Sequence, residues 1–174
     1  MAALHHGIVE STVWRQERDT QAFAQLLARA LLTLQPPGDA LIELRGNLGA
    51  GKTTLARHLL QALGVTGRIK SPTYAVVETY AVKPAGADLA VAHFDFYRFN
   101  DPDEWEEAGF RDLFAAPGLK LVEWPDKAQD RLPTPDLVLD IHSLASEAGH
   151  TDCPRQVKMS SFSAKGDALL KGVQ

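Results

Sequence analysis

The stretch GNLGAGKT, residues 46–53, fits the pattern G-x-x-x-x-G-K-[ST] of a phosphate-binding loop. Glycines within it let the main chain curl around an anion with its N–H groups turned inward, where side chains would obstruct. Lys52 would reach the β- and γ-phosphates of a nucleotide, and Thr53 would offer its hydroxyl to a magnesium ion. The pattern therefore predicts nucleotide binding.

The flanking sequence has the order that such a loop requires. ALIELR, residues 40–45, is a short apolar run typical of a buried strand, and TTLARHLLQALG, from 53, places leucines on one helical face before Gly64. Strand, glycine loop and helix follow one another. A helix that begins at the loop presents unpaired N–H groups and a positive dipole end to a phosphate.

The rest of the chain also divides into helix and strand patterns. An amphipathic helix is expected over residues 19–34, with Asp19 or Thr20 as its N-terminal cap. The other expected elements are a hairpin of strands 73–82 and 89–96, a short helix at 101–109, strands at 119–124, 137–141 and 156–159, and a last helix at 164–170. Together these patterns predict a three-layer α/β fold of the P-loop NTPase type, with a mostly parallel mixed sheet and an added β-hairpin. Residues 1–174 are expected to form one domain.

Composition limits the classes of function. The 174 residues are 45% hydrophobic, which is enough for a sizeable core, and the formal net charge of −4 disfavours direct, tight binding to a nucleic-acid backbone. The single Cys153 cannot form an internal disulfide, and no apolar run is long enough to span a membrane. The sequence is therefore expected to be that of a soluble, cytoplasmic protein.

Two acidic residues follow apolar strands and could complete the site. Phosphoryl transfer needs a further magnesium ligand and a group that orients water, and an acid at a strand end commonly supplies these. Asp95 follows LAVAHF, and Glu123 follows LKLV. The alternative for each is a solvated carboxylate at a strand end. The pattern does not divide metal ligation and water activation between them.

Several features narrow the nucleotide chemistry. The guanine-recognition motif N-K-x-D does not occur, which favours adenine. The candidate arginines are scattered, and none is paired in a lid-like loop; they are Arg57, Arg68, Arg98 and Arg111. Because an arginine finger can contribute a factor of roughly 10³ to 10⁵, turnover by the chain alone is expected to be slow. A partner is then needed to complete the site.

The chain resembles the bacterial TsaE (YjeE) family of ATPases, which are required for threonylcarbamoyladenosine modification of tRNA beside the anticodon. The resemblance covers about residues 11–172. The blocks that carry it are GNLGAGKTTLARHLLQALG at 46–64, IKSPTY at 69–74, HFDFYR at 93–98, DPDEWEEAG at 101–109 and LVEWPDKA at 121–128. Their order along the chain is far more specific than the phosphate loop alone.

The resemblance implies a set of site residues. Those implied to bind the nucleotide are Gly46, Asn47, Leu48, Gly49, Ala50, Gly51, Lys52, Thr53, Thr54, Thr20 and Trp124. Thr53 and Glu123 would hold magnesium, with Asp95 as a water-orienting or second-sphere metal residue, so the implied catalytic residues are Lys52, Asp95 and Glu123. The cofactor implied is Mg²⁺, with ATP as the substrate.

Other positions keep two interpretations. Ser71, Pro72 and Thr73 resemble the family's switch-like segment beside the γ-phosphate, or form a proline-directed turn. Trp124 adjoins the nucleotide or packs in the core, and Thr20 approaches the adenine or only caps a helix. The side chains of Phe94, Tyr97 and Arg98 shape a partner-facing surface or pack the hairpin.

The sequence also departs from the family. Asn47 stands where the family usually has an acid. Residues 143–155 do not align cleanly with the family, and a C-terminal nucleotide contact is expected near Gly149 or His150.

The function implied by the resemblance is ATP hydrolysis that resets a complex of TsaB- and TsaD-like proteins, with tRNA contacted at most indirectly. Two alternatives share the phosphate loop: a small-molecule kinase, and a nucleotide-gated binding module that does not hydrolyse ATP.

Overall fold

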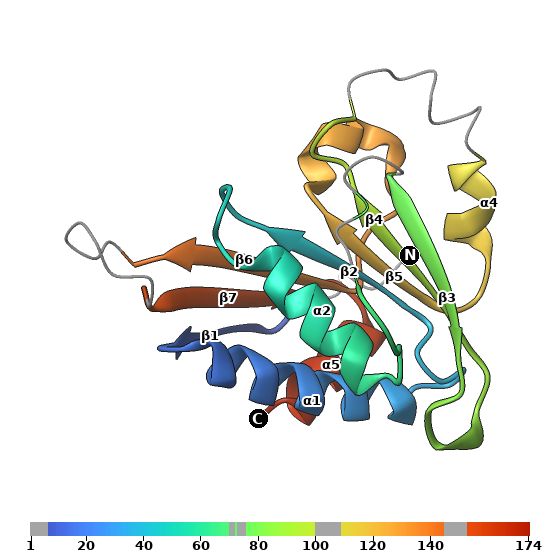
Figure 1. Ribbon diagram of the computed structural model, residues 1–174, viewed down its shortest axis with the longest axis horizontal. Coiled ribbons are helices and arrows are strands. Elements are labelled where there is room, and N and C mark those ends of the chain that lie inside the picture. The colour runs from blue at the N-terminus through green and yellow to red at the C-terminus, as the bar shows by residue number, and fades with distance from the viewer. Residues whose placement is uncertain (1–6, 70–71, 73–75, 100–108, 145–152) are drawn as a thin grey trace.

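A seven-stranded mixed sheet forms the centre of the protein (Figure 1). The computed structural model describes residues 7–69, 72, 76–99, 109–144 and 153–174. In chain order the elements are β1 (Val9–Trp14), α1 (Glu17–Thr33), β2 (Ala40–Arg45), α2 (Lys52–Ala62), β3 (Val77–Val82), the 3-10 turn η1 (Pro84–Gly86), β4 (Leu89–Asp95), α4 (Phe110–Ala115), β5 (Leu119–Glu123), the 3-10 segment η2 (Pro125–Arg131), β6 (Leu137–Ser143), β7 (Arg155–Ser161) and α5 (Ala164–Gly172).

The strand order is β1-β7-β6-β2-β5-β4-β3. Strands β6, β2, β5 and β4 are parallel neighbours, whereas β3 and β7 pair antiparallel with the strands beside them. The antiparallel pair β3 and β4 is the expected hairpin. This arrangement confirms the predicted α/β class with a mostly parallel mixed sheet.

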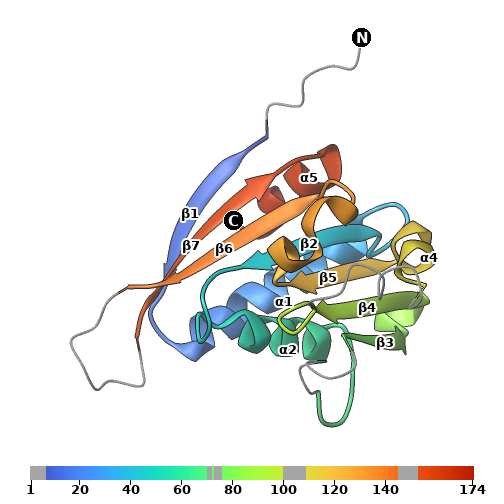
Figure 2. The same ribbon diagram turned by 90° about the horizontal axis from the view of Figure 1, so that it is seen from above.

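Helices cover the sheet unequally on its two faces (Figures 1 and 2). Because side chains alternate along a strand, those of Ile42 and Leu121 project from one face of the sheet, and those of Leu41 and Val122 project from the other. The first face packs against α1, α2 and α5 in the larger core cluster. The second carries Phe110 of α4 and Ala128 of η2 in a smaller cluster built largely of phenylalanine. The two clusters and the sheet between them make the three predicted layers.

Two expectations need correction, and two observed elements have no counterpart among the expected ones. The helix predicted from residue 19 begins at Glu17. Asp19 is the third residue of this helix, and its carboxylate accepts hydrogen bonds from the main-chain N–H groups of Arg15 and Gln16. Asp19 therefore stabilises the N-terminus from within the first turn. The first strand of the hairpin begins at Val77 rather than at 73. Strand β1 and helix α4 were not expected. The short helix predicted at 101–109 lies almost wholly outside the described residues.

The parallel strands direct their carboxyl ends toward one edge of the sheet. The phosphate loop follows β2 there, and Asp95 and Glu123 are the last residues of β4 and β5. Ligands of open α/β sheets bind at this edge, so the fold places the predicted site residues at one place.

Candidate functional site

The loop between β2 and α2 has a conformation that its glycines make possible. Gly46, Gly49 and Gly51 have φ angles of 135°, 78° and 108°, a region that L side chains rarely adopt. At Gly46 there is also no space, since a Cβ atom would lie 2.2 Å from the carbonyl oxygen of Ile141. The loop is thereby fixed against β6 at its start and leads into α2 at Lys52.

The Lys52 ammonium is enclosed by this loop. Lys52 is only 4% exposed, and its Nζ donates to the carbonyl oxygens of Gly46 at 2.6 Å and Asn47 at 2.9 Å. The same Nζ lies 3.9 Å from the ring centroid of Trp124. Burial lowers the pKa of Lys52, while the charges of Glu123 and Asp95 act to raise it. The lysine is thus already held among the loop's own oxygens, facing two acids.

The two acids lie side by side. Asp95 and Glu123 are register partners on β4 and β5, and they are 4% and 1% exposed. Glu123 Oε2 accepts a 2.7 Å hydrogen bond from the hydroxyl of Thr53, and Asp95 Oδ1 accepts one of 3.0 Å from the N–H of Tyr97. The structure therefore brings together Lys52, Thr53, Asp95 and Glu123, as the sequence predicted.

His93 joins the acids and was missed by sequence reasoning. Its Nε2 lies 2.9 Å from Oε1 of Glu123, and the side chain is 1% exposed. Toward an ionised Glu123 carboxylate, which only accepts hydrogen bonds, Nε2 would be the donor of this bond. Among the described residues, Nδ1 of His93 is buried without a hydrogen-bond partner. The signal was available: in LAVAHFD the alternation along β4 places His93 on the same face as Asp95.

Trp124 forms one wall of the site. Directly after β5 its main chain turns into the left-handed region, with a φ of 57°, which is a costly conformation for a bulky residue. This turn brings the indole to Lys52 and to Tyr97, whose ring centroid lies 5.0 Å away. Trp124 thus lies beside Lys52 and also packs against the smaller core cluster, and a nucleotide contact of Trp124 stays a prediction.

A polar pocket of about 220 Å³ lies between the start of α1 and the phosphate loop. Its lining residues are Trp14, Gln16, Glu17, Thr20, Ala50, Gly51, Thr54, Cys153 and Arg155. Thr20 is a buried residue inside α1 and not its cap, and it lines this pocket. Glu17 is held from α2 by His58 Nε2 at 2.9 Å and by Arg57 at 3.4 Å. The pocket adjoins the phosphate loop at Ala50 and Gly51.

Some of the other predicted positions lie within the described residues, and others lie outside them. Leu48 and Asn47 are exposed at the loop tip, and Pro72 is buried, with its carbonyl accepting a 2.7 Å hydrogen bond from the N–H of Val76. Phe94 is fully buried in the smaller core cluster, whereas Tyr97 is 38% exposed. Ser71, Thr73, Gly149 and His150 lie outside the described residues.

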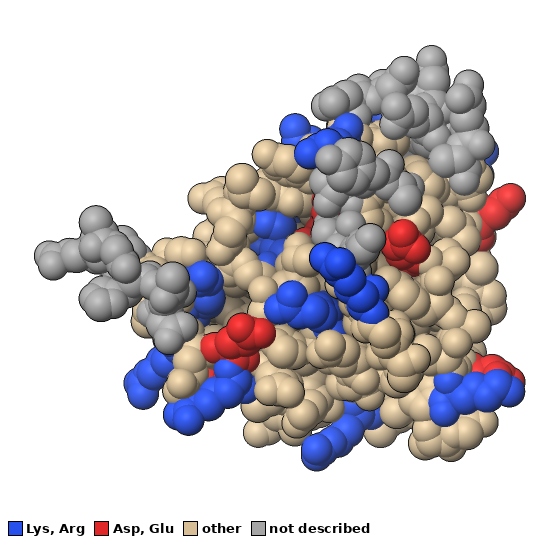
Figure 3. Space-filling view, in the orientation of Figure 1, with Lys and Arg blue, Asp and Glu red and all other residues tan. Residues whose placement is uncertain are grey.

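The surface over α2 carries positive charge. Lys and Arg side chains gather there, although the formal net charge of the chain is −4 (Figure 3).

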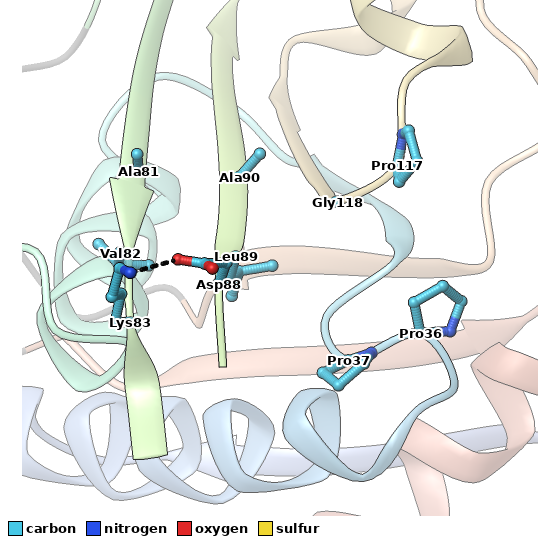
Figure 4. A pocket seen from close by; sticks show the side chains of 10 residues that line it. All are labelled: Pro36, Pro37, Ala81, Val82, Lys83, Asp88, Leu89, Ala90, Pro117 and Gly118. Carbon is cyan, nitrogen blue, oxygen red and sulfur yellow. Dashed lines mark ion pairs between the residues drawn. The ribbon is translucent and has the colours of Figure 1, made fainter. Parts of the chain in front are cut away.

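A second pocket, of about 380 Å³, lies at the opposite end of the sheet between Pro36 and the β3–β4 hairpin (Figure 4). Its charged lining residues are Lys83 and Asp88, which form an exposed ion pair of 3.0 Å. The acids and the lysine of the phosphate loop are not among its lining residues.

Comparison with known proteins decides the family. The sequence model described as "Threonylcarbamoyl adenosine biosynthesis protein TsaE" matches residues 14–152. The chain belongs to the TsaE family. This confirms the resemblance drawn from the sequence blocks.

Individual TsaE proteins from two bacteria agree with this assignment. The "tRNA threonylcarbamoyladenosine biosynthesis protein TsaE" of Haemophilus influenzae is 43% identical over 119 residues, which are 68% of this chain and 73% of that protein. The Bacillus subtilis TsaE protein is 36% identical over 122 residues, with 69% and 70% covered. A crystal structure of YdiB from Bacillus subtilis superposes with a TM-score of 0.69 at 24% identity, covers 97% of this chain and 96% of its own, and supports the fold.

Two further residues, Asn47 and Arg155, belong to the surroundings of the phosphate loop. Asn47 contributes its main-chain oxygen, which accepts hydrogen bonds from Lys52 and from the N–H of Ala50. Arg155, which lines the polar pocket, lies beyond the residues that the TsaE model matches.

No helix within the described parts of the chain combines the length and apolar character that crossing a bilayer requires.

Proposed function

We propose that this TsaE-family chain is a magnesium-dependent ATPase that supports threonylcarbamoyladenosine modification of tRNA in the cytoplasm, together with TsaB- and TsaD-like proteins. The observation that carries the proposal is the hydrogen-bonded chain from His93 through Glu123 to Thr53 at the start of α2. It lies beside Lys52 and Asp95, so the groups needed for phosphoryl transfer to water meet in one place.

The loop and Lys52 would bind the phosphates of ATP. The first turn of α2 supplies N–H groups and a positive dipole end. Lys52 Nζ now donates to the carbonyls of Gly46 and Asn47, and it can exchange these for phosphate oxygens without leaving the loop. Trp124 covers the ammonium from one side, which excludes water from that side of the charge.

The donor set suits magnesium. Thr53, Glu123 and Asp95 offer a hydroxyl and two carboxylates, and Mg²⁺ prefers oxygen ligands. Two carboxylates and a hydroxyl are few for a metal held by protein alone, which fits an ion shared with substrate phosphates. Thr53 and Glu123 would hold the ion, and bound there it would neutralise charge on the phosphates.

The two acids would then have different tasks. Glu123 is already engaged by Thr53 and His93, one on each carboxylate oxygen. Asp95, next to it on β4, is an acceptor at the end of a parallel strand. We assign to Asp95 the orientation of the attacking water: the water oxygen bonds to the γ-phosphorus, the bond from that phosphorus to the oxygen of the ADP leaving group breaks, and Asp95 accepts the water proton.

The test is ATP hydrolysis by the purified chain, alone and with TsaB and TsaD. Slow release of phosphate alone, stimulation by the partners, and loss of both in folded Lys52→Ala and Glu123→Ala variants are expected. Labelled phosphate transferred to a metabolite would identify a small-molecule kinase instead. Tight ATP binding without phosphate release in a single turnover would identify a non-hydrolysing binding module. Modification of tRNA that proceeds unchanged without this chain would contradict the assigned role.

A further inference from the structure

Arg155 reaches the phosphate loop from the other end of the chain. It is the first residue of β7, in register with Trp14 of β1 and Ser143 of β6. Its Nε donates to the carbonyl oxygen of Ala50 at 2.8 Å, and its Nη2 lies 3.5 Å from the carbonyl oxygen of Gly49. Its Nη1 donates to the carbonyl of Cys153, which ties the guanidinium to the residues just before β7.

These contacts determine how two peptide groups of the loop face. A trans peptide directs its C=O and the following N–H to opposite sides. Holding the carbonyls of Gly49 and Ala50 on the outside therefore turns the N–H groups of Ala50 and Gly51 into the loop. The N–H of Ala50 does point inward, where it donates at 3.1 Å to the Asn47 carbonyl that also accepts from Lys52.

The position of the guanidinium supports the same role. A Cβ atom built on Gly51 would lie 3.8 Å from Nε of Arg155, so the arginine lies directly against the residue that caps α2. Arginine stays charged at any physiological pH. The cation thus lies on the outer side of the loop, where it adds to the positive potential on the inner side.

We propose that Arg155 is a positioning residue that holds the phosphate loop in its anion-binding conformation. The inference rests on the proposed nucleotide binding. It makes the C-terminal strand, outside the residues matched by the family model, a part of the site. Without Arg155 the loop has to be ordered when the nucleotide binds, and this ordering lowers affinity.

Two measurements test the proposal. In calorimetry, Arg155→Met is expected to weaken ADP binding about tenfold, the scale of one charge-assisted hydrogen bond. Arg155→Lys, which keeps the charge and one donor, should fall between the wild type and Arg155→Met. In hydrogen exchange of the nucleotide-free protein, residues 46–55 should exchange faster in Arg155→Met, while β2 and β6 remain protected. This second effect is not expected of a residue that only stabilises the fold.

Lys158→Met is the matched control, because it removes the same charge from the same strand but from the opposite, exposed side. It should leave both measurements unchanged. If Arg155→Met does not fold, Arg155→Lys carries the test. ADP affinity within twofold of the wild type, with unchanged exchange of residues 46–55, would overturn the proposal. A wild-type protein that binds no ADP would instead overturn the proposed function, and the exchange data would still decide whether Arg155 orders the loop.

Discussion

The hydroxyl of Thr53 donates a 2.7 Å hydrogen bond to the carboxylate of Glu123, which lies 70 residues further along the chain. The bond joins the first turn of α2 to the end of β5. It sets the distance between the phosphate loop and the acids, and it keeps one oxygen of Glu123 directed at the helix. The pair is therefore the natural place to test for a magnesium site.

Replacing Thr53 by valine removes the hydroxyl and keeps the shape of the side chain. We expect Thr53→Val to raise the Mg²⁺ concentration needed for half-maximal hydrolysis about tenfold, because one oxygen ligand is lost. Binding of ADP without metal should change little. Titration of activity and of ADP binding with Mg²⁺ measures both effects. Thr54→Val is the control, since Thr54 lines the polar pocket instead; an equal effect of both substitutions would argue against metal ligation by Thr53.

His93 is expected to act through Glu123 by donating a hydrogen bond. His93→Leu keeps the buried volume but removes the donor, and should lower magnesium-dependent hydrolysis about 10- to 100-fold, as is usual for residues that orient a metal ligand. His93→Gln offers an amide N–H to the same oxygen and should recover most of the loss. The rate as a function of Mg²⁺ concentration is the measurement. Equal impairment of the two variants would show that His93 serves packing alone.

Gly46 is expected to tolerate no side chain, for two reasons at once. Gly46→Ala combines an unfavourable φ of 135° with a Cβ atom 2.2 Å from the Ile141 carbonyl, and should lower the free energy of unfolding by about 3 kcal/mol. Gly49→Ala has an unfavourable φ alone, with open space around it, and should cost about 1 kcal/mol. Urea unfolding of both variants gives the comparison. Equal losses would mean that the contact with β6 does not constrain the loop.

Asp39 gives a prediction for the pH dependence of stability. Burial acts to raise the pKa of Asp39, but hydrogen bonds from Lys165 and the N–H of Gly118, with the charges of Lys165 and Lys120, outweigh it and hold the pKa below its ordinary value. A lowered pKa stabilises the fold above the unfolded-state pKa, and this contribution is lost as pH falls through the folded-state pKa. Asp39→Asn should therefore cost about 2 kcal/mol at pH 7, because the buried Lys120 loses its charged partner.

The loss in Asp39→Asn should shrink as the pH falls from about 4 toward 2, where Asp39 of the wild type takes up a proton. Urea unfolding at several pH values measures the difference between the two proteins. Asp88→Asn, which breaks the exposed pair with Lys83, should show no measurable change at either pH. A loss in Asp39→Asn that is independent of pH would contradict the role of its charge.

Local sequence predicted the phosphate loop because the loop depends on local properties: glycines, a lysine, and the strand and helix that flank them. The acids could be predicted because parallel strands end at one edge, so Asp95 and Glu123 had to lie together. The start of α1 was misplaced by two residues, since Asp19 looks like a cap but acts from inside the first turn.

The parts that sequence reasoning missed depend on contacts between distant residues. β1 pairs with β7, and nothing in VESTVW indicates a partner that begins at Arg155. Arg155 was not singled out because its bonds to Gly49 and Ala50 span more than a hundred positions. His93 was visible only as one letter of a block, because its role appears when β4 and β5 pair.

The strand order of the sheet also affects how the chain can fold while it is being synthesised. In the described sheet, β1 has β7 as its strand partner, and β7 lies between β1 and β6. During synthesis Val9–Trp14 leaves the ribosome early, yet its neighbour becomes available only once Arg155–Ser161 has emerged. The nascent chain can build α1, β2 and α2 long before that, but it carries a strand with an open edge until synthesis reaches β7.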